Sequence, residues 1–173
     1  YQVVYLNQSK AEEIYESPGI GDSDWRFIYC LLPQGQSRSY YGLVKLRQHP
    51  EHTADYSRMI PMIRITEMYY IAAECRMEAG PGYDKSKALD YLNTVRRHRG
   101  IAQAEELPAS LTDAEVKEEI YKEYRKEFVG EGQIFFYYKR KGMETIPGYN
   151  GEMTDLQYQY PMPDDEIALG GRI

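Results

Sequence analysis

The sequence predicts a mainly α protein, built from a helical hairpin and further helices, with irregular loops and a short β-hairpin near the N-terminus. Two observations support this class. Apolar residues recur at helical spacing in several segments, and Gly/Pro turns separate those segments. Segments rich in aromatic and β-branched residues, typical of strands, lie before residue 50. We expect one domain over residues 1–173, because about 150 residues is usual for a domain.

The N-terminal part combines short apolar segments with polar loops. Residues 1–17 are interpreted as a short strand or turn that runs into a helical turn, and residues 17–21 as a loop. The segments WRFIYCLL and YYGLVKL are rich in aromatic and β-branched residues, and the polar stretch PQGQSRS separates them. Two strands joined by a loop are the simplest interpretation. A polar loop then follows from His49 to Tyr56.

The first strong helical pattern begins at Ile65. Apolar or small residues recur there every three or four positions, which is the spacing of one helix face. The Gly80–Gly82 turn ends the helix, because Gly suits the left-handed position after a helix and Pro cannot continue one. The predicted buried face consists of Met68, Tyr69, Ala72, Cys75 and Ala79.

A second helix follows, with Asp84 as its predicted N-cap. Its expected face is Ala88, Leu92 and Val95, flanked by Leu89 and Tyr91. The pair resembles a tetratricopeptide-type hairpin, with small residues where the two helices meet. One such hairpin cannot bury its apolar face alone, so other helices must cover it.

A third helix is predicted from Thr112, which forms a capping box with Glu115. Glu118 and Lys122 are expected to form an ion pair on its outer side. The segment QIFFYYKRK then predicts a short aromatic helix ending near Lys141, whose FFYY run must bury at least one side. The chain is expected to be irregular from Gly142 onwards. The buried stripe of the third helix is Val116, Ile120, Tyr124 and Phe128.

Basic residues crowd the end of the second helix and could indicate nucleic-acid binding. These residues are Arg96, Arg97, His98 and Arg99. Cations at a helix C-terminus also stabilise its negative end. Because the net charge is −6, we favour the structural explanation and expect no nucleic-acid partner. No apolar segment reaches the roughly 18 residues that span a bilayer.

Candidate metal and thiol sites are sparse. His49 and His52 with Glu51 could hold a metal, but a third ligand from elsewhere would be needed, and we expect no metal or cofactor. Cys75 is expected in the core as a small apolar residue. A disulfide between Cys30 and Cys75 stays open as a minor alternative.

The sequence predicts no catalytic site. Glu123, Glu127 and Glu131 lie one helical turn apart and could be taken as an acid/base pair for glycoside cleavage. That chemistry needs carboxylates facing each other across a cleft, which neighbours on one helix do not provide. We therefore expect a solvated or ion-paired helix face, and no phosphate-binding loop or nucleophile motif is present.

The best candidate for ligand binding is aromatic. Trp25, the single Trp, together with Tyr40 and Tyr41 brackets a polar loop that contains Arg38. Flat rings can hold the C–H faces of sugars, while nearby polar groups bind the hydroxyls. The alternative is that Trp25 and one of the tyrosines pack against the helices instead.

Four stretches in this order resemble the C-terminal part of the SusD/RagB family of Bacteroidota outer-membrane lipoproteins. Gln133 and Phe135 depart from the residues most common in the family at their positions, which are His and Trp. The stretches are RITEMYYIAAE (64–74), ALDYLNTVRRHRGI (88–101), EYRKEFVGEGQIFFYYKR (123–140) and YPMPDDEI (160–167).

The resemblance implies a non-catalytic protein that binds glycans or other nutrients at the cell surface. Family members deliver them to a TonB-dependent, SusC-like transporter and hold to the outer membrane by an N-terminal lipid anchor. We expect this chain to be the C-terminal portion of a longer protein, with the anchor outside it. An alternative is a helical-repeat module whose partner is another protein, and a glycosidase is a more distant one.

Overall fold

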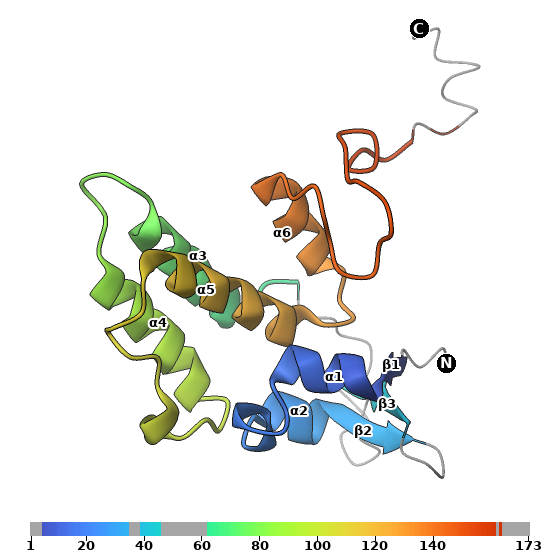
Figure 1. Ribbon diagram of the computed structural model, residues 1–173, viewed down its shortest axis with the longest axis horizontal. Coiled ribbons are helices and arrows are strands. Elements are labelled where there is room, and N and C mark those ends of the chain that lie inside the picture. The colour runs from blue at the N-terminus through green and yellow to red at the C-terminus, as the bar shows by residue number, and fades with distance from the viewer. Residues whose placement is uncertain (1–4, 35–38, 46–61, 162, 164–173) are drawn as a thin grey trace, which may run out of the picture. The chain divides into compact units, whose positions relative to one another are not determined.

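The computed structural model describes residues 5–34, 39–45, 62–161 and 163. The described residues form six α-helices, two short 3-10 helices and a three-stranded antiparallel sheet (Figure 1). About 51% of them are helical, so the predicted mainly α class is confirmed. The chain divides into two compact units, residues 1–130 and 131–173. The first unit contains β1 (Tyr5–Asn7), α1 (Gln8–Tyr15), α2 (Trp25–Cys30), β2 (Leu31–Gln34), β3 (Tyr40–Leu43), α3 (Ile65–Met77), α4 (Lys85–Arg97) and α5 (Asp113–Phe128).

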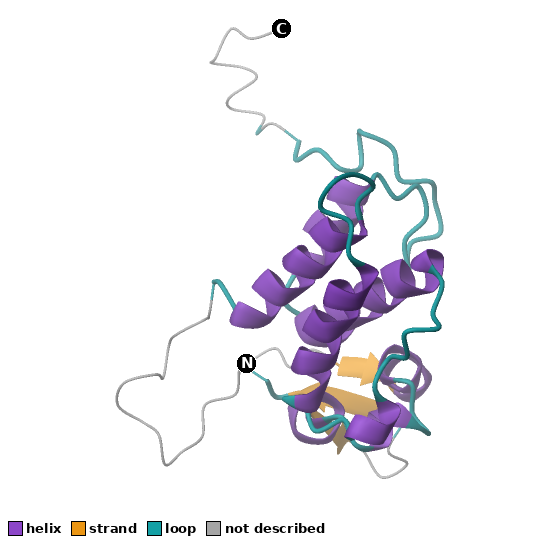
Figure 2. Ribbon diagram, turned by 90° about the vertical axis from the view of Figure 1, so that its left-hand side faces the viewer, coloured by secondary structure: helices purple, strands orange, loops and turns teal. Residues whose placement is uncertain are grey.

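The small sheet has the order β1-β3-β2, and its strands are drawn in orange in Figure 2. The partners across it are Leu6 and Tyr41, and Leu31 and Leu43. These four residues pack on one face against a core of Ala11 and Tyr15 from α1. The other face carries exposed tyrosines, Tyr5 and Tyr40.

The segment WRFIYCLL was predicted as a strand, and this prediction is wrong for its first six residues. Trp25–Cys30 form α2, and only then does the chain enter β2. Asp24 caps the helix, because its carboxylate accepts a hydrogen bond from the Arg26 backbone N–H. This cap and the ion pairs of Arg26 outweigh the strand preference of the aromatic residues. The second predicted strand is present as β3.

The helical hairpin is present as α3 and α4, and α5 packs against both. The predicted buried face of α3 is wrong by one position. Tyr70, Ala73 and Met77 are buried with Thr66, whereas Met68 and Cys75 are exposed. Two neighbouring faces of α3 are apolar enough to be buried, the predicted one and the one that contains Tyr70. The face with Tyr70 is buried because the hydroxyls of Tyr70 and Thr66 donate hydrogen bonds to Glu123 and Glu127 of α5.

The predictions for α4 and α5 are confirmed in most details. Asp84 accepts a hydrogen bond from the Lys87 N–H, and Thr112 and Glu115 form the capping box. The predicted ion pair of Glu118 with Lys122 is wrong, because Lys122 binds Glu119 and Glu16, the residue that follows α1, instead. Both cysteine thiols are free. All the predicted core residues of α4 and α5 are buried, namely Ala88, Leu92, Val95, Val116, Ile120, Tyr124 and Phe128.

The second unit contains α6 (Gln133–Lys141) and a folded loop after it. Tyr137 and Tyr138 are buried and Phe136 is exposed, as expected for a helix that buries one side of its aromatic run. Gly142 ends α6 in the left-handed conformation. No helix within the described ranges is long and apolar enough to span a membrane.

Candidate functional site

A cluster of buried charges lies between α2, α4 and α5. At its centre are the Glu123 and Glu127 carboxylates of α5, which are 0% and 1% exposed. Arg26 Nη1 lies 2.8 Å from Glu123 Oε2, and its Nη2 lies 2.7 Å from Asp24 Oδ2. From the end of α4, Arg96 binds Glu123 and Arg99 binds Glu127 at 3.3 and 2.7 Å. We call Asp24, Arg26, Arg96, Arg99, Glu123 and Glu127 the buried ion-pair cluster.

The guanidinium groups keep the buried carboxylates ionised. Burial alone raises the pKa of Glu123, but the positive charges of Arg26, Lys126 and Arg96 outweigh it and lower this pKa to about 2. The pKa of Glu127 is also lowered against burial, through Arg99 and Arg26. The two carboxylates therefore remain charged at neutral pH and bind arginines, which confirms the ion-paired interpretation for Glu123 and Glu127. Glu131, the third predicted member of this face, lies beyond the end of α5.

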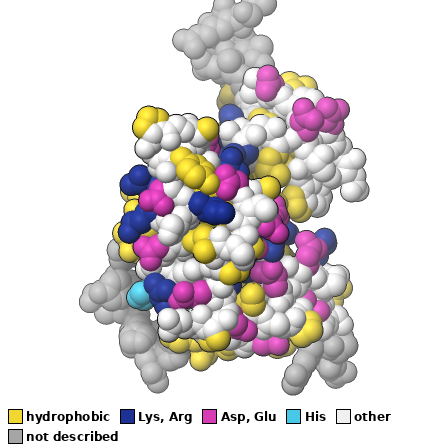
Figure 3. Space-filling view, turned by 60° about the vertical axis from the view of Figure 1, so that its left-hand side comes forward, with side chains coloured by type: hydrophobic (Ala, Val, Ile, Leu, Met, Phe, Trp, Pro, Cys, Tyr) yellow, Lys and Arg dark blue, Asp and Glu magenta, His cyan; other side chains and the backbone are white. Residues whose placement is uncertain are grey.

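Two of the four basic residues at the end of α4, Arg96 and Arg99, point into the buried ion-pair cluster. Arg96 is 1% exposed, and Arg99 is partly buried against Glu127. On the surface in Figure 3, Lys and Arg side chains lie among Asp and Glu side chains rather than in a field of one sign. The geometry therefore supports the structural explanation of the basic cluster over nucleic-acid binding.

The buried ion-pair cluster determines which side of α2 faces solvent. Because Arg26 points into the cluster, the opposite side of this short helix carries Trp25, Ile28 and Tyr29. These three side chains are 50%, 41% and 67% exposed. They form an apolar, two-ring stripe that we call the α2 aromatic surface.

Trp25 is held in place by the chain that follows α4. Its backbone N–H donates a 2.7 Å hydrogen bond to the Arg99 carbonyl. Its indole lies directly over Gly100, where an added Cβ would be 2.3 Å from the indole Nε1. Gly100 also has a φ of +87°, which disfavours other residues. The absence of a side chain at Gly100 therefore leaves the space that the indole occupies.

Replacing Gly100 by Ala is expected to displace the indole and to destabilise the protein by about 1–2 kcal/mol, through clash and left-handed strain. The matched control is Gly82→Ala, because nothing lies within 4 Å of a Cβ there. The fluorescence of Trp25 should change in the first variant only, and urea unfolding gives the stability. Identical spectra for both variants would contradict this placement of the indole.

The structure places Trp25 and Tyr40, two of the residues that the sequence suggested as one site, on different elements. Trp25 begins α2, whereas Tyr40 pairs with Gln34 at the end of β2, so the two lie at opposite ends of the α2–β2 segment. Tyr41 is half-buried and its ring packs against Phe27 at 5.3 Å between centroids. Arg38 lies outside the described residues, as do His49, Glu51 and His52. Among the described residues, no group of three His, Cys, Asp or Glu side chains could hold a metal.

Sequence reasoning missed Ile28, Tyr29 and the roles of Asp24 and Arg26. The strand interpretation concealed the i, i+3, i+4 spacing of Trp25, Ile28 and Tyr29. One signal was available: a charged Arg26 inside an otherwise apolar segment indicates a buried partner.

The described chain is mainly helical and carries the exposed aromatic rings of Trp25 and Tyr29 on α2. The chain belongs to the SusD family, whose model matches residues 32–169. This family is known for glycan binding at the cell surface, and its members are non-catalytic binding proteins. No curated protein and no solved structure matches the chain.

Proposed function

We propose that this protein binds a glycan at the cell surface without catalysis and delivers it to a TonB-dependent, SusC-like outer-membrane transporter. Membership of the SusD family is the observation that carries the proposal. Members are typically lipoproteins of the outer-membrane surface, and we propose the same location, with a lipid anchor, for this protein.

The α2 aromatic surface is the proposed glycan contact. The indole of Trp25 and the ring of Tyr29 lie one helical turn apart, so two neighbouring sugar rings can place their apolar C–H faces on them. Ser23, two residues before α2, donates a 3.5 Å hydrogen bond to Glu105 from the segment after α4, and these two side chains offer polar atoms for sugar hydroxyls. Tyr40 and Arg38 remain proposed additional contacts, whereas the packing of Tyr41 favours a structural role.

Removing the rings should weaken binding. We expect Trp25→Ala and Tyr29→Ala each to lower the affinity for the bound glycan about tenfold, or ~1.4 kcal/mol, through lost ring contacts. Isothermal titration calorimetry against a panel of neutral polysaccharides gives the affinities. Phe136→Ala, which removes another exposed ring, is the control and should bind like the parent protein.

Two results would contradict the proposal. The first is the absence of binding to every glycan of the panel, both for the parent chain alone and for the full-length protein together with its transporter. The second is equal affinity in the parent and in both ring variants, which would remove the α2 aromatic surface from the site.

A second candidate is a helical module that binds a protein rather than a glycan. The exposed apolar side chains of α3 favour it, since Ile65, Met68 and Ile71 are 71%, 42% and 40% exposed. A pull-down without glycan tests this role. It is supported if the purified chain recovers a SusC-like transporter and the Ile65→Ser variant does not.

A further inference from the structure

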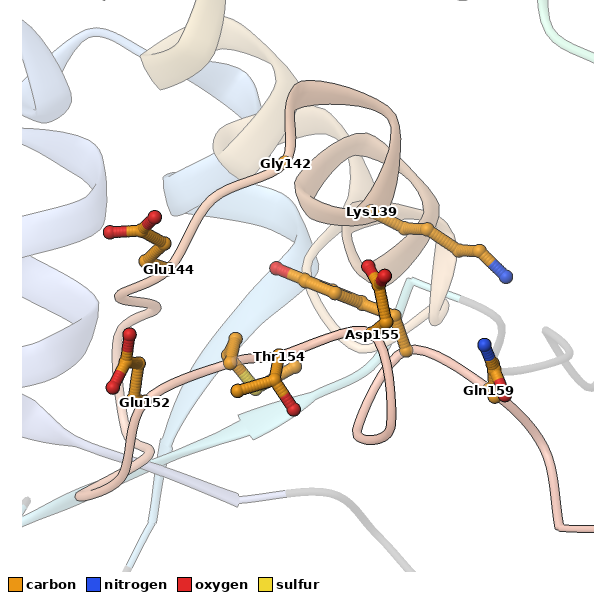
Figure 4. A pocket seen from close by; sticks show the side chains of 9 residues that line it. Lys139, Gly142, Glu144, Glu152, Thr154, Asp155 and Gln159 are labelled. Carbon is orange, nitrogen blue, oxygen red and sulfur yellow. The ribbon is translucent and has the colours of Figure 1, made fainter.

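The unit of residues 131–173 contains a pocket of about 450 Å³ beside the end of α6 (Figure 4). Its size is that of ordinary small-molecule sites. Its residues come from the last turn of α6 and from the loop that follows. The lining consists of Lys139, Gly142, Glu144, Glu152, Met153, Thr154, Asp155, Tyr158 and Gln159.

Backbone hydrogen bonds within the loop fix the walls of this pocket. The Met153 N–H donates to the Glu144 carbonyl at 2.8 Å, which joins the two sides of the loop. The Thr154 carbonyl then accepts from the N–H of Tyr158, forming the turn that carries Asp155. The Tyr158 hydroxyl donates to the Met143 carbonyl at 2.6 Å. The walls of the pocket are therefore fixed by hydrogen bonds within the unit of residues 131–173.

The pocket combines an apolar floor with a polar rim. Met153 and Tyr158 are each 6% exposed, whereas the other side chains of the lining are exposed. The rim carries three carboxylates, of Glu144, Glu152 and Asp155, and one ammonium, of Lys139. Within the part of the chain that the structure describes, none of these carboxylates forms a hydrogen bond or an ion pair with another side chain.

The charges are not evenly distributed around the pocket. The hydrogen bond from Met153 to Glu144 brings the backbone of Glu144 beside that of Glu152. In Figure 4 the carboxylates of both residues lie toward one end of the lining, and Lys139 and Gln159 lie at the opposite end. Asp155 and Thr154 lie between the two ends in the same view. One end therefore favours a positive group, while the middle and far end offer acceptors and donors for hydroxyls.

We infer that this pocket binds an amino-sugar unit, with the ammonium group at Glu144 and Glu152 and the hydroxyls at Thr154 and Asp155. The apolar floor suits the C–H face of the sugar ring, as in other ring contacts. The excess of carboxylates disfavours uronic acids and sulfated sugars, because like charges repel. This inference deepens the proposed glycan binding and rests on it, but it concerns a different unit from the α2 aromatic surface.

The test compares two disaccharides with the same linkage, the β-1,4-linked disaccharide of glucosamine and cellobiose, at pH 6. Calorimetry should show roughly fivefold tighter binding of the aminated sugar, the range expected for exposed charge pairs. The preference should disappear in the double variant Glu144→Gln/Glu152→Gln. Glu118→Gln, a change of an exposed carboxylate on α5, should leave it intact.

Backbone amide NMR locates the site, and the expected shifts map to residues 139–159. Equal affinity for the two sugars, an unchanged preference in the double variant, or shifts confined to other residues would each overturn the inference. Trp25 fluorescence reports on the α2 aromatic surface separately, because the chain has one Trp. A negative result for amino-sugar binding in the pocket is thus distinguishable from a negative result for the proposed glycan binding at the α2 aromatic surface.

Discussion

Replacement of Arg26 by Met is expected to lower the free energy of unfolding by about 3–5 kcal/mol, the cost of breaking a buried ion pair from one side. The variant leaves Asp24, Glu123 and Glu127 without the guanidinium that binds all three. Global stabilities are only about 5–15 kcal/mol, so this is a large share of the total. Urea unfolding followed by circular dichroism measures the loss.

The matched control is Arg97→Met, at the end of α4. Arg97 pairs with Glu106, but its side chain is 41% exposed, so its loss should cost less than about 1 kcal/mol. The loss of stability in Arg26→Lys should be intermediate, because lysine keeps the positive charge but lacks the planar guanidinium that binds carboxylates with two hydrogen bonds. Similar losses for Arg26→Met and Arg97→Met would show that the buried ion-pair cluster does not stabilise the fold.

Acid is expected to destabilise the protein through Glu123. Its pKa is about 2 in the folded chain against an ordinary value of 4.5, so the folded state binds the proton less readily than the unfolded state. The contribution is therefore complete above pH 4.5 and is lost as the pH falls from 4.5 towards 2. This difference corresponds to about 3 kcal/mol, and the lowered pKa of Glu127 adds in the same direction.

Urea unfolding at a series of pH values from 7 to 3 checks this dependence. In Glu123→Gln the group that titrates is absent, so stability should be lower at pH 7 and should fall less steeply in acid. Glu118→Gln provides the control, because this carboxylate is exposed and its removal should leave the pH dependence of the parent. Parallel curves of unfolding free energy against pH for the parent and Glu123→Gln would show that Glu123 does not cause the loss of stability in acid.

Patterns within single helices were strong enough to be predicted from the sequence. The stripe from Val116 to Phe128 repeats every four residues, and the capping box of Thr112 with Glu115 marks where that helix begins. Such signals depend on neighbours within one turn, so no tertiary information is needed. The same holds for Asp84 and for the glycine that ends α6.

Signals that depend on distant residues were misjudged. The segment from Trp25 to Cys30 contains residues that favour strands, but two of the buried partners of Arg26, Glu123 and Glu127, come from α5, about 100 residues later. The face of α3 was misassigned for a related reason, because two adjacent apolar stripes were available. Only the positions of Glu123 and Glu127 decide between them.

The candidate site likewise has features that depend on local sequence and features that depend on distant residues. The sequence by itself determined the mainly α class, the limits of α4, α5 and α6, and the likeness to the SusD family, because these reside in local periodicity and in the order of motifs. Only the tertiary structure decided that Arg26 lies inside, that Trp25 and Tyr29 face solvent, and that the loop after α6 forms an open pocket with the last turn of that helix. A charged side chain loses its water on burial, so it takes the position where ionic partners from other elements meet it, and this fixes the direction of the rings beside it.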